Sequence, residues 1–170
     1  MYNSKVKQNA TPDSSFWINA HRSGLLPYVL ERYQLHYTPA VGNELREEFA
    51  SGREFWMLVR EGVITEATPG VEEVREFGTG ERAAINLALE HRDWILLIDD
   101  RRPFIEAERR ALNVLCTPVL VVDLFSEGKL DARQALEALA RLAAMQTVSR
   151  DLIAASLAYS GNTWKGQGGR

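Results

Sequence analysis

The sequence predicts an α/β protein, a three-layer α/β/α sandwich with a central parallel sheet. Two observations predict this class. Short segments with the apolar pattern of β-strands alternate along the chain with longer segments whose apolar residues recur at helical spacing. One short segment, WILLI at residues 94–98, is apolar on both faces, as strands of a buried parallel sheet are. Such alternation places a parallel sheet between two layers of helices.

The composition fits one soluble domain. The chain has 170 residues, and we expect a single domain at residues 1–159 followed by a flexible, glycine-rich tail at 160–170. The 20 basic and 23 acidic side chains give a formal charge of −3, which argues against indiscriminate binding of nucleic acid. A single cysteine, Cys116, allows no disulfide framework. We find no secretory signal and no membrane-spanning segment, so we expect a cytoplasmic protein.

The N-terminal half is expected to alternate between helices and strands. Residues 16–33 have helical apolar spacing with a break near Gly24, and the following YQLHY at 33–37 alternates as a strand does. Residues 55–62, FWMLVREG, favour a helix, and VITEA at 63–67 favours a short strand.

A further helix is expected to start between these segments. Thr38 followed by Pro39 is typical of a helix start, because threonine caps the helix and proline suits its first turn. Val41, Leu45 and Phe49 would then lie on a single face of this helix.

The C-terminal half is expected to contain a long strand between helices. The expected elements are helices at 71–77, 81–91 and 104–112 and a strand at 113–122. The first helix is expected because its apolar residues are three apart. In the last third, Asp131 and Gln134 form a capping-box pattern. They precede an apolar helical stripe of Leu136, Leu139 and Leu142.

Acidic side chains are expected to meet at the carboxyl edge of this sheet. Asp99 and Asp100 directly follow the strand at 94–98, and Glu81 lies in the first turn of the helix before it. About ten helical residues span roughly 15 Å, and five strand residues span roughly 17 Å, so Glu81 should lie level with the aspartates. Like charges crowded there repel unless a cation holds them, and carboxylate oxygens suit Mg²⁺ or Mn²⁺.

Two further acids, Glu44 and Asp13, could reach the same edge, and every one of these acids also has an ordinary interpretation. Glu81 could interact with the helix dipole, and Asp99 and Asp100 could open a turn. Glu44 could be an exposed helical glutamate, and Asp13 could cap the helix that follows it.

A nucleotide-binding site is the competing interpretation of this region. GTGERA at 78–83 matches the loose dinucleotide pattern G-x-G-x-x-A, and Asp99 lies at about the right distance to bind a ribose. That pattern must follow a strand, whereas the residues at 71–77 have helical spacing. A receiver domain of a response regulator fits less well still, since only about 70 residues follow ILLIDD.

Taken together, these motifs resemble the PIN-domain family of metal-dependent ribonucleases. The chain is most similar to the bacterial single-domain members, which include the toxins of toxin–antitoxin pairs. GERAAINLALEHRDWILLIDD is similar to the family's helix that begins with an acid and the strand that ends in a catalytic aspartate. TPAVGNELRE is similar to the helix of the second acid, Glu44. DSSFWINA resembles the opening Asp-x-Ser/Thr motif, with Asp13 and Ser15.

The resemblance implies a function, a cofactor and partners. It implies one or two Mg²⁺ or Mn²⁺ ions, an RNA substrate, an antitoxin protein as partner and a homodimer. The implied catalytic residues are Asp13, Ser15, Glu44, Glu81 and Asp100, with Asp99 as the alternative to Asp100; the acids would bind the metal.

The chain departs from the family pattern in three places. The family's first strand is apolar, whereas KVKQNATP is mostly polar, with Pro12 just before Asp13. NATP also resembles an alternative opening motif in which Asn9 would replace the acid. Glu81 stands where many members have aspartate.

Two functions follow as hypotheses. The first is a metal-dependent endoribonuclease, which could be the toxin of a toxin–antitoxin pair. The second is a catalytically weak or inactive PIN-like module that binds nucleic acid or a partner protein, which the polar first strand favours. The homodimer is expected because the helix at 55–62 has more aromatic surface than a short peripheral helix needs.

Overall fold

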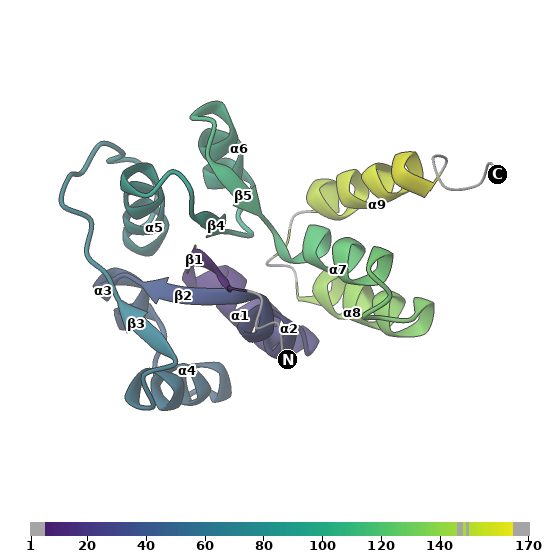
Figure 1. Ribbon diagram of the computed structural model, residues 1–170, viewed down its shortest axis with the longest axis horizontal. Coiled ribbons are helices and arrows are strands. Elements are labelled where there is room, and N and C mark those ends of the chain that lie inside the picture. Colours follow the sequence, from purple (N-terminus) through teal and green to yellow (C-terminus); the bar gives the residue numbers. More distant parts are fainter. Residues whose placement is uncertain (1–5, 146–147, 149, 165–170) are drawn as a thin grey trace.

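A five-stranded parallel sheet forms the centre of the computed structural model (Figure 1). The structure describes residues 6–145, 148 and 150–164. The strands are β1 (Gln8–Pro12), β2 (Tyr33–Tyr37), β3 (Ile64–Glu66), β4 (Ile95–Leu97) and β5 (Asn113–Leu115). Their order across the sheet is β3-β2-β1-β4-β5, and every neighbouring pair is parallel.

Helices connect the strands and cover the sheet. They are α1 (Ser14–Ser23), α2 (Leu26–Arg32), α3 (Pro39–Glu44), α4 (Ala50–Arg60), α5 (Thr79–Glu90), α6 (Arg101–Arg109), α7 (Thr117–Ser126), α8 (Ala132–Ala144) and α9 (Arg150–Trp164). In Figure 1, α5 and α6 lie beside β4 and β5, and α7, α8 and α9 pack together at the far end of the molecule. None of the helices in the described ranges is long and apolar enough to cross a membrane.

The apolar core is divided into two clusters by the sheet. Within and just after β4, Leu97 belongs to the larger cluster, whereas Leu96 and Ile98 belong to the smaller one. Successive residues of a strand point to opposite faces, so the two clusters lie on opposite sides. The larger cluster is covered by α1, α2, α4, α7 and α8, and the smaller one by α5 and α6. The predicted three-layer class is confirmed.

The polar strand β1 occupies the centre of the sheet. It pairs with β2 on one side and with β4 on the other, where Pro12 lies opposite Leu97. Ala10 and Thr11 are fully buried. Pro12 is tolerated because it stands at the strand's last position, and the next backbone N–H, that of Asp13, donates to the Leu97 carbonyl at 2.9 Å. The strand therefore delivers Asp13 to the carboxyl edge of the sheet.

The expected helix at 71–77 is wrong, because this segment is a loop. Asn86 holds it in place: its Oδ1 accepts hydrogen bonds from the backbone N–H groups of Glu73 and Val74, and its Nδ2 donates to the Val74 carbonyl. Val74 is buried, but Val71 is 62% exposed. The spacing of three thus reflects one anchored valine in a loop and not a helical face.

The expected strand at 113–122 is also wrong beyond its first residues. β5 ends at Leu115, and α7 begins at Thr117 with Pro118 in its first turn. Both elements are apolar because both are buried, and a buried helix cannot be distinguished from a buried strand by apolar residues alone. The pair Thr117–Pro118 was the available signal for a helix start.

The helix that begins after Thr38 is shorter than expected. Thr38 caps it as predicted, since its Oγ1 accepts from the backbone N–H of Val41. However, α3 ends at Glu44, and a turn separates it from α4. Leu45 is buried, but Phe49 is 57% exposed, so the expectation that both lie on one helical face is wrong.

In the C-terminal part the predicted capping box is confirmed, but the predicted apolar stripe is not buried along its whole length. Asp131 and Gln134 form the expected capping box at the start of α8. Leu142 is buried, whereas Leu136 is 67% exposed. The tail expected to be flexible from residue 160 is helical as far as Trp164, and residues 165–170 lie outside the described residues.

The aromatic residues of α4 pack within the chain. Phe55 is fully buried, and Trp56 contacts Phe55 and Tyr37 edge to face. The indole N–H of Trp56 also donates to the Leu45 carbonyl at 2.7 Å. These contacts account for the aromatic surface that suggested a homodimer, so the homodimer stays a prediction of the family resemblance alone.

We expect Gly52→Ala to destabilise the protein. A Cβ atom at Gly52 would lie 2.0 Å from the backbone carbonyl oxygen of Arg46, so the turn before α4 must shift, at about 1–3 kcal/mol in the free energy of unfolding. Urea denaturation measures this loss. Gly70→Ala is the control, since its Cβ would meet Glu90 at an ordinary 3.5 Å. Equal losses in the two variants would contradict the prediction.

Candidate functional site

The carboxyl edge of the sheet brings two acidic segments together. Asp13 directly follows β1, and Asp99 and Asp100 follow β4. Because β1 and β4 are parallel neighbours, the residues after both strands emerge at the same edge. This is where ligands bind in open α/β sheets.

Asp13 is a buried carboxylate that is only half satisfied. It caps α1 through Oδ1, which accepts from the backbone N–H of Phe16 at 2.7 Å. Its Oδ2 is buried and has no hydrogen-bond partner among the described residues. Burial, with the nearby charges of Asp99, Glu81 and Glu44, raises the pKa of Asp13 well above its usual value. An ionised Asp13 therefore needs a compensating positive charge.

Glu44 connects α3 to the start of α5. Its Oε1 accepts from the backbone N–H of Gly80 at 3.0 Å and from the Thr79 hydroxyl at 3.2 Å, and its Oε2 accepts from the Ser14 hydroxyl. A Cβ atom at Gly80 would lie 2.5 Å from Glu44 Oε2. Glycine at position 80 therefore permits the close approach of this carboxylate to α5.

Glu81 lies in the first turn of α5, as expected. Its Oε2 accepts from the backbone N–H of Gly78 at 3.0 Å, as in a capping box. Its side chain is half-buried, and this burial, followed by the charges of Asp100 and Glu44, raises the pKa of Glu81. Glu81 thus lies within electrostatic reach of acids from β4 and α3.

The two adjacent aspartates have different environments. Asp99 is fully buried, and it accepts from the backbone N–H and hydroxyl of Thr117 at 2.7 and 2.8 Å and from Asn19 Nδ2 at 2.6 Å. Burial raises the pKa of Asp99, and these hydrogen bonds oppose the shift. Asp100 is exposed and caps α6 by accepting from the backbone N–H of Arg102 at 3.1 Å.

Because of these hydrogen bonds, Asp99 and Asp100 have different structural roles. Asp99 joins β4 to α1 and α7 and has little capacity left for a ligand. Asp100 faces solvent at the edge, where its charge contributes to the raised pKa of Glu81. The geometry therefore favours Asp100 over Asp99 as a ligand.

Two sequence candidates lie differently from what the motif implied. Ser14, and not Ser15, is the serine whose hydroxyl contacts Glu44. Asn9 lies near the beginning of β1, where its Oδ1 is 2.9 Å from Nε2 of His36. It is four residues before Asp13, so Asp13 holds the first position at the carboxyl edge.

Sequence reasoning missed the residues that position the acids. They are Ser14, Asn19, Thr79, Gly80 and Thr117. Gly80 is part of GTGERA and of GERAAINLALEHRDWILLIDD, but neither motif predicted a role for the glycine. No local pattern connects Asn19 or Thr117 to Asp99, because these contacts form only when α1, β4 and α7 meet.

The carboxylate oxygens are suitable ligands for a divalent cation, although the acids do not converge on one point. In the part of the chain that the structure describes, no three histidine, cysteine, aspartate or glutamate side chains form a group that could hold a metal. Glu44, Glu81 and Asp100 each accept a backbone N–H instead. Their oxygens are nevertheless the ligands that Mg²⁺ and Mn²⁺ prefer, and Asp13 Oδ2 offers a buried oxygen with an unused lone pair.

Comparisons with known proteins place the chain in a family. A family model described as a PIN domain matches residues 10–160. A search of curated proteins finds no significant match. Ten chains of known structure match significantly. One of them is titled "Structure of the PIN domain endonuclease Utp24" and has a TM-score of 0.47 and 10% identity, over 64% of this chain and 84% of that chain.

We expect the metal-free protein to lose stability as the pH rises. The pKa of Asp13 is raised in the folded state, so between the unfolded pKa of about 4 and the folded pKa the native state binds more protons than the unfolded state. Stability then falls with increasing pH. Thermal unfolding in EDTA at pH 5 and pH 8 should show this loss.

Asp13→Asn is the matched variant, because asparagine can still cap α1. It should reduce the pH dependence and raise Tm at pH 8 by a few degrees, since about 1 kcal/mol shifts Tm by roughly 2–4 °C at this chain length. The same pH dependence in the variant and the original protein would show that Asp13 is not the group responsible.

Proposed function

This chain belongs to the PIN-domain family, and from that premise we propose that it is a Mg²⁺- or Mn²⁺-dependent endoribonuclease. One observation carries the proposal: a buried carboxylate oxygen of Asp13 has no hydrogen-bond partner among the described residues and lies near the charges of Glu44, Glu81 and Asp99. A fold that only needed a cap for α1 would not require the second oxygen to be buried and unpaired.

Asp13, Glu81 and Asp100 would hold the cation, with Glu44, which accepts from the first turn of α5, as a further acid. A divalent cation held by these acids would supply a water of lowered pKa for attack on a phosphodiester and would neutralise charge on the phosphate.

The remaining residues of the site keep the acids in place. Ser14, Thr79 and Gly80 orient Glu44 by donating to both of its oxygens. Asp99 fixes the end of β4 by its bonds to Thr117 and Asn19, which determines where Asp100 leaves the strand. These residues act by positioning, without touching the reacting atoms.

The negative charge of the acidic edge makes RNA binding depend on a bound divalent cation. Several carboxylates at one edge repel a polyanion, and a divalent cation removes part of this repulsion. RNA binding at the edge and cation binding are therefore expected to support one another. This coupling accounts for an acidic site in a protein whose substrate is itself negatively charged.

The second candidate function is a catalytically inactive module that binds nucleic acid or a partner protein. The observation that favours it is the absence of a preformed three-acid group in the described residues. A role as the toxin of a toxin–antitoxin pair, with an antitoxin partner, stays a prediction from the family resemblance.

The proposal predicts cleavage of single-stranded RNA in Mg²⁺ or Mn²⁺ and none in EDTA. Asp100→Asn removes one ligand charge and keeps the cap of α6, so activity should fall by a factor of about 10² or more while Tm is retained. Asp93→Asn is the control, since Asp93 is exposed before β4, at the opposite edge of the sheet. If all three proteins cleave equally, or none cleaves with either metal, the enzyme proposal is wrong.

A second test displaces an acid without removing any charge. Gly80→Ala places a methyl group 2.5 Å from Glu44 Oε2, so Glu44 must move away from α5 and RNA cleavage should decrease at least tenfold. Alanine favours a helix by up to about 1 kcal/mol over glycine, so stability should not fall. Cleavage rates and Tm should be measured together. A stable variant with undiminished activity would count against a role for Glu44.

A further inference from the structure

A cavity of about 450 Å³ lies beside Glu44, between α1 and the turn before α4. Its lining includes Glu44, His21, Arg22, Arg46 and Phe49. We propose that this cavity holds a nucleotide of the RNA strand next to the cleaved phosphate, with its base stacked on Phe49 and its phosphate beside Arg46. The inference rests on the proposed function, because it takes RNA as the ligand of the acidic edge.

Phe49 has a position that the fold does not explain. It is 57% exposed, and it is the N-cap residue of α4, where its side chain offers no acceptor for the N–H groups of the first turn. Serine, threonine, aspartate or asparagine would stabilise that helix end better. Single exposed apolar residues are common, but this one lines a cavity that also contains a candidate catalytic acid.

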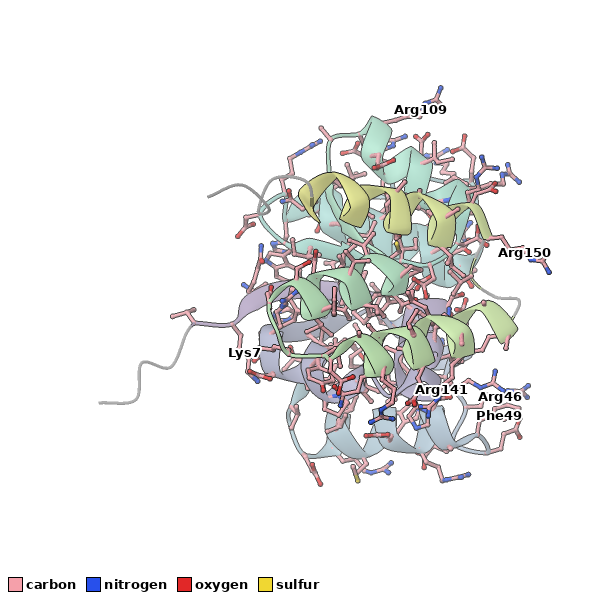
Figure 2. All side chains as sticks on the ribbon, turned by 90° about the vertical axis from the view of Figure 1, so that its right-hand side faces the viewer. Lys7, Arg46, Phe49, Arg109, Arg141 and Arg150 are labelled. Carbon is pink, nitrogen blue, oxygen red and sulfur yellow. The ribbon has the colours of Figure 1, made fainter. Side chains whose placement is uncertain are left out.

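Arg46 supplies the positive charge at the same place. Its guanidinium lies 5.7 Å from the centre of the Phe49 ring, and Figure 2 shows both side chains extending from the same end of the molecule. Arg46 pairs with Glu48 at 3.2 Å, but both side chains are more than half exposed, so this ion pair contributes little and can be exchanged for a phosphate. Arg22, from α1, adds a second cation to the lining.

The chemistry of the cavity matches one nucleotide more closely than a peptide or a free ion. An exposed aromatic face stacks on any base, and an adjacent arginine binds phosphate. Glu44 lies in the lining of the cavity and also accepts from the first turn of α5, so a strand bound here continues directly to the acidic edge. The cationic side of the cavity offsets the repulsion that this edge exerts on RNA.

The first test is RNA binding without cleavage. Fluorescence anisotropy with a labelled single-stranded RNA in Mg²⁺, with Asp100→Asn present in every protein compared, measures binding while cleavage is suppressed and the cation still reduces the repulsion at the edge. Phe49→Ala should weaken binding by about 5- to 150-fold, the effect of one lost base–aromatic stack, and Phe49→Trp should retain it. Phe125→Ala is the matched control, since Phe125 is a 40% exposed phenylalanine on α7. In Mg²⁺, Phe49→Ala should raise KM more than it lowers kcat.

The second test measures the phosphate contact. Arg46→Ala should weaken binding and reduce the slope of log Kd against log salt by about 0.7, the value for one phosphate contact in a single strand. Arg109→Ala is the control: Arg109 also pairs with one glutamate, Glu106, and lies at the opposite end of the view in Figure 2. It should leave the slope unchanged.

The outcomes separate this inference from the proposed function. If the protein cleaves RNA but Phe49→Ala and Arg46→Ala bind and cleave like the original, the cavity is not the nucleotide site and the nuclease proposal stands. If RNA binds through Phe49 and Arg46 but is never cleaved, the cavity is confirmed and the nuclease proposal fails. If the folded protein does not bind RNA at all, or binds it only through other residues, the inference is wrong.

Discussion

The pairing of β1 with β4 is the constraint on which the rest of the site depends. It places a short, polar strand at the centre of the sheet and ends it at Pro12, so that the backbone of Asp13 bonds to Leu97 and its side chain is enclosed at the carboxyl edge. One oxygen of that side chain caps α1, and the other has no partner among the described residues. A protein that keeps such a group ionised must provide a positive charge or bind one.

The other exposed or half-buried acids of the edge accept hydrogen bonds from the backbone. Glu44, Glu81 and Asp100 each accept a backbone N–H near the sheet edge, which keeps like charges apart when no cation lies between them. These bonds are with exposed or half-buried side chains, so they can be exchanged for metal contacts at small cost. Asp99 is different, because its buried bonds to Thr117 and Asn19 hold three elements together.

The sequence allowed the sheet edge to be predicted but not the turns around it. Elements with a specific start, such as the Thr38 cap and the capping box at Asp131, were predicted because capping is local. The error at 113–122 arose because a buried strand and a buried helix are both apolar. The error at 71–77 arose because the spacing of three included Val71, which is exposed in a loop. The acids Asp13, Glu44, Glu81 and Asp100 were found from strand and helix ends and from the family resemblance. Ser14 and Thr117 could not be, since their roles depend on contacts between distant segments.

The central claim is that the carboxyl edge is a divalent-cation site built around Asp13. Anomalous diffraction from crystals grown with Mn²⁺ tests it most directly, because it locates the ion without relying on activity. We expect a manganese peak within about 2.0–2.4 Å of Asp13 Oδ2 and of at least one oxygen of Glu81 or Asp100. A well-ordered edge at saturating Mn²⁺ with no peak there, or with Asp13 Oδ2 bonded only to protein or water, would contradict it.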